Sequence, residues 1–246
     1  MRRSDYPRPF QTMLIDLNAP AAYADEGLPV RAYPRILPIP PGAVSEDADT
    51  LILEPWRRDV KLYPQLYFLV GRDLPQEAAG RDETAVLGYG LGLAFRDNGI
   101  LLASPGAVPR DEASCFWYSL YTDGSQILSD EMLPEADLSS VVLTISSKTA
   151  GRAEYPQKDL LFDGGRILNE TREFIEFRKY DLIALGCAGT PLFLPADRKF
   201  EEDEILTVDG GVFGTMNITI KDRRDPAVCI PGWKPRAFFK EEGYLR

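Results

Sequence analysis

Runs of apolar residues in the first half of the chain predict buried strands. Residues 51–55 (LILEP) and 60–70 (VKLYPQLYFLV) are rich in aliphatic and aromatic side chains, and Gly71 ends the second run. Runs of this length, bounded by turn residues, are typical of strands. Proline cannot donate a hydrogen bond to a neighbouring strand, so Pro64 marks an edge, a bulge or a bend within the second run.

Later segments continue the strand pattern. Residues 90–95 (GLGLAF) predict a buried strand whose glycines permit close packing, and residues 141–148 (VVLTISSK) alternate as a strand does. Residues 181–185 (DLIAL) predict another buried strand, which ends before Gly186. Residues 204–220 (EILTVDGGVFGTMNITI) predict a hairpin with Asp-Gly-Gly at its turn.

Two stretches predict short helices. In residues 74–90, Pro75 lies near an expected first turn and Gly88 near its end. Apolar residues recur on one face between Arg166 and Arg178, and this spacing predicts a second helix. Strands outnumber helices, which favours an α+β fold dominated by β-structure.

Composition divides the chain into three parts. Residues 1–45 are rich in proline, and we expect an N-terminal arm or edge segment that packs on the main body. We place the main domain at residues 46–221 and a C-terminal strap at residues 222–246. An aromatic cluster at Phe116, Trp117, Tyr118 and Tyr121 is assigned either to a pocket wall or to the core or a subunit contact.

Charge and cysteine content narrow the function classes. The 246-residue chain carries a net charge of −10, which argues against nucleic acid as a partner. No apolar run approaches the length of a membrane span, so we expect no membrane partner. Cys115, Cys187 and Cys229 have no metal-binding spacing and fit free thiols in the cytoplasm, where we place the protein.

The chain contains no histidine. This excludes Ser-His and Cys-His catalysis, histidine general bases and zinc sites that use histidine. Proton transfer would then depend on a carboxylate, lysine, tyrosine, cysteine or metal-bound water.

Four motifs follow one another along the chain. They are VKLYPQLYFLVGRDL from Val60, GYGLGLAFRD from Gly88, LLFDGGRILNE from Leu160 and DEILTVDGGVFGTMNITI from Asp203. Their order and spacing resemble the fumarylacetoacetate hydrolase family over roughly residues 35–221. The resemblance implies a mixed β-sheet roll or barrel with a few short helices, and a homodimer.

The resemblance also implies a divalent metal site, from which this sequence departs. In the family, carboxylates come from the Glu-x-Glu of D-Y-E-x-E-L-x-x-V-I-G and from the first aspartate of N-D-x-S-x-R-D. We align Pro64 and Leu66 with the glutamates, and Gly92 or Ala94 with the aspartate. We therefore expect no metal cofactor, and Mg²⁺ or Mn²⁺ only if the ligand positions align differently.

Two substrate-contacting motifs depart as well. The family's K-[SG]-F lysine aligns with Ser114. Its G-T-P-A-G loop aligns without gaps with residues 186–189 (GCAG), whereas an insertion after the strand restores Gly-Thr-Pro around Thr190.

Six residues are candidates for a site. Tyr63 and Gln65 flank the aligned metal positions and would donate to an enolate, the alternative for Tyr63 being a packed aromatic. Arg96 would bind a substrate carboxylate, and Asp97 would orient the Arg96 side chain. The alternative is that Arg96 and Asp97 form a structural ion pair. The remaining two candidates for substrate contact are Cys187 and Thr190. The alternative for Cys187 is a thiol that is simply buried in the core.

The implied function is chemistry on a small-molecule acid. Family members act on 2-oxo and 1,3-dicarbonyl acids, so the resemblance implies a C–C hydrolase, isomerase, lyase or decarboxylase, here without the usual metal site. The alternative is a catalytically silent protein that binds a metabolite or stabilises a paralogous partner. A third hypothesis is that the chain shares only the fold.

Overall fold

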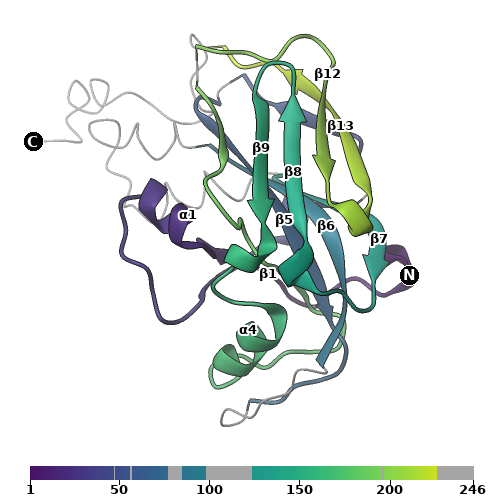
Figure 1. Cartoon of the computed structure of the whole chain (residues 1–246). Coiled ribbons are helices and arrows are strands. Elements are labelled where there is room, and N and C mark those ends of the chain that lie inside the picture. The colour runs from purple at the N-terminus through teal and green to yellow at the C-terminus, as the bar shows by residue number, and fades with distance from the viewer. Residues whose placement is uncertain (47, 56, 77–84, 98–123, 196, 226–246) are drawn as a thin grey trace, which may run out of the picture.

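The computed structural model describes residues 1–246 apart from positions 47, 56, 77–84, 98–123, 196 and 226–246 (Figure 1). Ser114, the aromatic cluster around Trp117 and most of the expected C-terminal strap lie outside the described residues. Within the described ranges, no helix combines the length and the apolar character needed to cross a bilayer.

Among the described residues, the larger of two sheets has eight strands. Its path runs through β2 (Arg35–Pro38), β1 (Thr12–Asp16), β10 (Leu182–Ala184), β5 (Val60–Val70), β6 (Val86–Asp97), β7 (Gln126–Leu133) and β3 (Val44–Glu46), and β11 (Leu192–Leu194) pairs with β5 off this path. Strand β1 is parallel to β10, whereas β5, β6 and β7 are antiparallel neighbours. The sheet is therefore mixed.

The second sheet has five strands and packs against the first (Figure 1). Its order is β4 (Thr50–Leu53), β13 (Thr215–Asp222), β12 (Glu204–Asp209), β8 (Val142–Ser147) and β9 (Gly151–Pro156). Fully buried side chains from both sheets form one apolar core, with Leu66 and Phe68 from the first sheet and Leu143 and Leu206 from the second. Each such side chain contributes roughly 1.5–3 kcal/mol to folding.

Strand β5 has the bounds that the sequence predicts, and it lies in the interior of the sheet. Proline is tolerated there because Pro64 falls in a gap between two partners on one side of β5. Residues 60–62 pair with β11, residues 67–69 pair with β10, and the connection between these two short strands passes Pro64. The gap leaves room beside β5 at the positions that carry the candidate site.

The first 45 residues contribute strands to the larger sheet. Strand β1 lies between β2 and β10 and is paired on both sides. After β1 the backbone reverses through Leu17, which has a left-handed φ of 58°, and enters α1 (Pro20–Asp25). This segment is part of the sheet and supplies its edge strand β2.

The helix predicted between Arg166 and Arg178 differs from the structure. Helix α4 (Gly164–Thr171) begins with the Asp163 side chain accepting from Arg166 N, but it ends seven residues before Arg178. Phe174, expected on its buried face, is 76% exposed, because the chain turns there to bring Phe177 to a bridge with Leu74. The other prediction, over residues 74–90, lies largely outside the described residues, and its last part is strand β6.

The strand predictions are confirmed where the structure describes them. The GLGLAF run lies in β6, and a side chain at Gly90 would overlap the buried ring of Tyr67, so the glycine permits close packing as expected. Strands β12 and β13 form the predicted hairpin, although a short 3₁₀ turn at Gly211–Phe213 lengthens its connection and exposes Val212. The predicted α+β fold dominated by a mixed sheet, with few helices, is confirmed.

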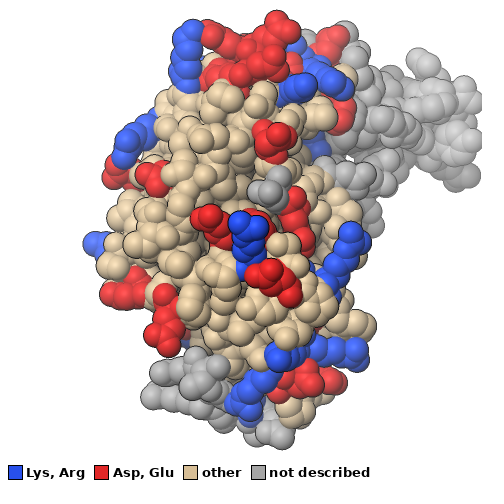
Figure 2. Space-filling view, turned by 90° about the vertical axis from the view of Figure 1, so that its right-hand side faces the viewer, with Lys and Arg blue, Asp and Glu red and all other residues tan. Residues whose placement is uncertain are grey.

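Charged side chains of both signs share the surface. On the face shown in Figure 2, lysine and arginine are scattered among aspartate and glutamate, with uncharged surface between them. This face offers no continuous basic strip of the kind that follows a nucleic-acid backbone.

Candidate active site

The β5–β6 hairpin places several polar residues on one face. The register pairs Tyr63 with Ala94 and Gln65 with Gly92, and directly paired residues of antiparallel strands point to the same side. Arg96 lies two residues beyond Ala94 and therefore joins this face. Tyr63, Gln65 and Arg96, three of the six candidates, thus converge.

The alternation of β5 corrects the alignment of the metal positions. Leu66 points into the core between the sheets, whereas Tyr63 and Gln65 line a cavity on the opposite face. In the motif E-x-E-L-x-x-V-I-G the glutamates precede the glycine by eight and six residues, and the same count from Gly71 reaches Tyr63 and Gln65. The assignment of Pro64 and Leu66 was therefore wrong by one residue.

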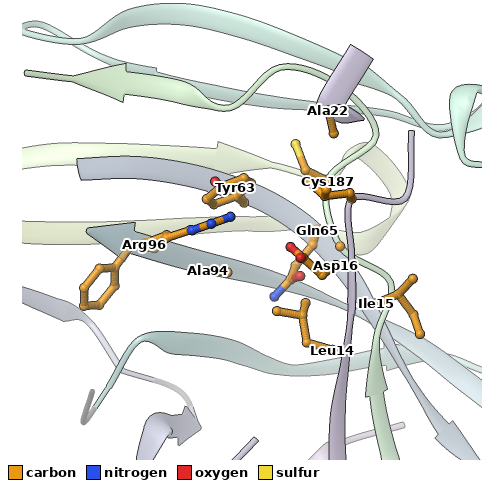
Figure 3. A pocket seen from close by; sticks show the side chains of 12 residues that line it. Leu14, Ile15, Asp16, Ala22, Tyr63, Gln65, Ala94, Arg96 and Cys187 are labelled. Carbon is orange, nitrogen blue, oxygen red and sulfur yellow. The ribbon is translucent and has the colours of Figure 1, made fainter. Parts of the chain in front are cut away.

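The cavity is small and polar on one side. Its lining includes Asp16, Tyr63, Gln65, Ala94, Arg96 and Cys187. Figure 3 shows Arg96 extending past the Tyr63 ring toward Asp16 and Gln65. The free volume of about 20 Å³ accommodates about one water molecule. Residues of β1, of the turn after it and of α1 cover the cavity, among them Leu17 in the turn and Ala22 in α1.

Acidic residues of the covering segment pair with the two cations of this face. Lys61, the cross-strand partner of Arg96, places its Nζ 2.5 Å from Asp25 Oδ2 and 2.9 Å from Glu26 Oε1. The same Glu26 oxygen lies 3.8 Å from Arg96 Nη1. The end of α1 is therefore held to the hairpin by ion pairs.

Arg96 stays charged in this environment. Burial lowers the pKa of its guanidinium, but the neighbouring Tyr63, Asp16 and Glu26 outweigh burial and hold that pKa above its ordinary value. A buried, permanently charged guanidinium is suited to binding a planar carboxylate through two parallel hydrogen bonds.

Asp16 is a cavity residue that the sequence analysis missed. It ends β1, is 7% exposed, and its Oδ2 lies 3.4 Å from Arg35 Nη1. Burial raises the pKa of its carboxyl group, against the opposing effects of Arg96 and Arg35. The only sequence signal is an acid that follows an apolar run in TMLID, and such residues are common at strand ends.

Three further groups fix the chemistry that the cavity can perform. Burial raises the pKa of the Tyr63 hydroxyl, which therefore remains a proton donor, and raises the pKa of the Cys187 thiol to about 12. At neutral pH Cys187 is thus a thiol rather than a nucleophilic thiolate. Gln65 Nε2 donates to Gln126 Oε1 at 2.8 Å, and the buried Gln65 Oε1 accepts no hydrogen bond.

Two of the sequence candidates lie elsewhere. Asp97 follows Arg96 on β6 and points to the other face, where its Oδ2 accepts from Arg58 N at 3.2 Å. It lies beside Arg57, and its charge raises the pKa of that guanidinium against the larger effect of burial, which leaves the pKa at about 10. Thr190 is exposed and does not line the cavity.

The donors around the cavity do not match the Mg²⁺ or Mn²⁺ site that the resemblance implies. Such ions take several oxygen ligands, mostly carboxylates. Among the described lining residues Asp16 is the sole carboxylate, and the Arg96 guanidinium occupies the same space. In the described ranges, no three His, Cys, Asp or Glu residues come together in a way that could hold a metal.

Sequence comparison finds no match, whereas structure comparison finds proteins with a similar fold. No protein-family model and no curated protein sequence matches the chain. A protein of Yersinia pestis CO92 described as belonging to the fumarylacetoacetate hydrolase family has a TM-score of 0.71 at 18% identity, over 88% of this chain and 95% of its own.

Two enzymes are similar to the chain to a comparable degree. For 5-carboxymethyl-2-hydroxymuconate delta-isomerase from Mycobacterium smegmatis the TM-score is 0.67 at 19% identity, over 87% of this chain and 79% of that one. For fumarylpyruvate hydrolase from Pseudomonas aeruginosa, solved with Mn²⁺ and pyruvate, the TM-score is 0.66 at 16% identity, over 86% and 89%. The chain has the fold of these proteins, as the sequence resemblance implies.

Proposed function

We propose that the chain is a divergent member of the fumarylacetoacetate hydrolase family that acts on a small 2-oxo or 1,3-dicarbonyl acid, with Arg96 rather than a metal ion as the cation of the site. One observation carries the proposal: Tyr63, Gln65 and the charged Arg96 converge on one cavity in a fold shared with an isomerase and a hydrolase of such acids. The reaction is a C–C hydrolysis, isomerisation, lysis or decarboxylation, all of which pass through an enolate.

The residues of the cavity have distinct roles in this proposal. Arg96 receives the carboxylate of the acid, because its charge is permanent and it points into the cavity (Figure 3). Tyr63 donates to the oxygen that becomes negative, since its hydroxyl stays protonated. Gln65 Oε1 accepts a hydrogen bond from an enol hydroxyl, because it is buried without a hydrogen-bond partner.

The size of the cavity adds a requirement. A space of about 20 Å³ holds a water molecule but no organic acid. Binding therefore requires the covering segment, here α1 and Glu26 after it, to move away from the hairpin, while β1 with Asp16 stays paired in the sheet. The ion pairs of Glu26 with Lys61 and Arg96 would open in that movement.

The closed cavity and its ion pairs also support a second candidate function. If the covering segment stays closed, Glu26 and Asp16 satisfy Arg96 permanently and the cavity has no ligand. The chain would then be the catalytically silent protein, which stabilises a partner or binds a metabolite elsewhere.

A thermal-shift titration tests the two. The protein is titrated with oxalate and with pyruvate, each with and without Mg²⁺ or Mn²⁺, because a ligand of the folded state raises its melting temperature by mass action. A shift with acid alone that Arg96→Gln abolishes supports the proposal. A shift that needs metal and acid together overturns the role of Arg96, and no shift with any acid favours the silent protein.

A further inference from the structure

Asp16 occupies the cavity as a carboxylate that the proposed function leaves without a role. Its side chain is 8% exposed and it lies on the same face of the sheet as the convergent residues of β5 and β6 (Figure 3). Its Oδ2 is buried and accepts no hydrogen bond, although it forms an ion pair with Arg35. Burying a carboxylate oxygen that accepts no hydrogen bond lowers the stability of the fold, whereas burying an apolar side chain raises it.

The backbone around Asp16 is held in place at a cost. Leu17, the next residue, has a left-handed φ of 58°, a conformation that costs a non-glycine residue about 1–2 kcal/mol. Asn18 fixes the turn, since its Nδ2 donates to the carbonyls of Phe162 and Leu185, both at 2.8 Å, and its Oδ1 accepts from Phe162 N at 2.9 Å. Strain of this kind is concentrated at functional sites.

The contrast with Asp181 shows what is particular to Asp16. Asp181 is also buried, and burial raises the pKa of its carboxyl as well. Its two oxygens, however, accept from Gln11 N, Gln11 Nε2 and Arg178 N at 2.7–3.2 Å, which ties the first strand to the β10 segment. Asp181 is therefore a structural carboxylate, whereas the Asp16 side chain points into the cavity and its Oδ2 accepts no hydrogen bond.

We propose that Asp16 is the proton-transferring residue of this site, taking a proton from the carbon next to the carbonyl of a bound 2-oxo acid. The inference rests on the proposed function, because it needs an acid in the cavity. The C3–H bond breaks, its proton goes to Asp16 Oδ2, and its electron pair forms the C2–C3 double bond as the carbonyl electrons move to oxygen. Return of a proton to C3 restores the keto acid, so nothing else is consumed.

The surroundings of Asp16 fit a base rather than a permanent acid. The charged or titratable groups that face it from the elements packed around it are Arg96 of β6, Arg35 of β2, Glu26 after α1, Tyr63 of β5 and Cys187. Burial and Glu26 raise the pKa of Asp16, whereas the two arginines lower it, and burial has the largest effect. Asp16 is therefore a stronger base than an ordinary aspartate, and it is ionised once the pH exceeds its pKa.

Exchange of C3 protons for solvent deuterium measures this step directly. Pyruvate is incubated with the protein in D₂O and the loss of the methyl proton signal is followed by NMR across the pH range. The wild type is expected to accelerate exchange, with a rate that rises with pH through an inflection above the ordinary aspartate value of 3.8. Asp16→Asn is expected to lose about 100-fold or more of the rate and the inflection.

Matched variants separate catalysis from structure. Asp16→Glu retains a carboxylate and is expected to recover part of the exchange rate, whereas Asp181→Asn is expected to lower the melting temperature and leave exchange by the folded protein unchanged. Binding is measured in parallel from the oxalate thermal shift, which Asp16→Asn is expected to retain.

The outcomes divide cleanly. Acid binding by the wild type without exchange, or exchange that Asp16→Asn retains, overturns the role of Asp16 and leaves the acid site standing. Absence of acid binding overturns the proposed function and, with it, this inference.

Discussion

The two faces of the β5–β6 hairpin are both buried, but they are built differently. Toward the second sheet point Leu66, Phe68, Leu91 and Leu93, which pack into the continuous apolar core. Toward the other side point the cation pair Lys61 and Arg96 with Tyr63 and Gln65, which carry the ion pairs and the cavity.

The difference shows which side of the hairpin stabilises the molecule and which side costs free energy. Burying apolar side chains is favourable in proportion to the area removed from water. Burying Arg96, Asp16 and Gln65 is costly unless each group is compensated, and the Gln65 and Asp16 oxygens are compensated incompletely. A face retained at such a cost is a candidate for function, and the four predictions below test that contrast.

The largest effect is expected on the apolar face. Phe68 is fully buried and packs edge-on against Tyr89, with ring centroids 5.9 Å apart. Phe68→Ala is expected to lower the free energy of unfolding by about 3–5 kcal/mol. On the polar face, Tyr63→Phe removes a hydroxyl only and is expected to cost about 1 kcal/mol or less. Equal losses in urea denaturation would erase the contrast between the faces.

Gly186, next to the cavity, lies at a close contact between the end of β10 and β1. Gly186 has φ +73°, and a Cβ there would collide with the Ile15 carbonyl, so β1 approaches the end of β10 only because this residue lacks a side chain. Gly186→Ala is expected to cost roughly 2–4 kcal/mol from strain and overlap together.

Gly211 provides the matched control. Its φ is +60° but a Cβ there meets nothing within 4 Å, so Gly211→Ala pays for the conformation alone, about 1–2 kcal/mol. Calorimetric melting of both variants measures the difference, and equal melting temperatures would contradict the close approach at Gly186.

The covering segment offers a smaller effect on ligand affinity. Glu26 competes with a ligand carboxylate for Arg96, so Glu26→Gln is expected to tighten oxalate binding about three- to tenfold in isothermal titration. Glu154→Gln, which removes an exposed ion pair with Arg152, is expected to leave the affinity as it is. Weaker binding by Glu26→Gln would mean that Glu26 helps to hold the ligand.

The smallest effect concerns stability and pH. The pKa of Asp16 is higher in the folded protein than its ordinary value of 3.8, so the folded state binds more protons than the unfolded state as that value is passed. At about pH 3 the Asp16 carboxyl is largely protonated in both states, so its ionisation does not lower the free energy of unfolding. As the pH rises through the folded pKa, the ionisation lowers that free energy. Asp16→Asn is expected to match the wild type at about pH 3 and to exceed its stability at about pH 7, in denaturation curves at both values. A variant less stable at about pH 7 would show that Asp16 serves the fold.

Much of the fold could be predicted because strand signals are local. The run from Val60 to Val70 carries its own pattern, and the structure gives it the same bounds. Tyr63, Gln65 and Arg96 were found because they lie on such runs. Helix α4 was predicted too long because its end depends on a contact between Phe177 and Leu74, about a hundred residues apart, which periodicity does not contain.

Asp16 could not be found in the same way. It reaches the cavity through the parallel pairing of β1 with β10, and nothing within residues 12–16 indicates that partner. Asp97 was predicted beside Arg96 on sequence adjacency, but neighbours on a strand point to opposite faces. Pairing and alternation, rather than residue type, therefore decided which candidates meet.

The pairing of Thr12 with Leu182 also determines when, during synthesis of the chain, the cavity can form. A ribosome releases β1 early, and β2 is soon available as its antiparallel partner, but β10 emerges only after about 170 further residues have been synthesised. A nascent chain that stops short of β10 already contains Tyr63, Gln65, Arg96 and Asp16, yet it lacks the strand that brings Asp16 to the others. The cavity is thus completed late in synthesis, only after β10 has joined β1.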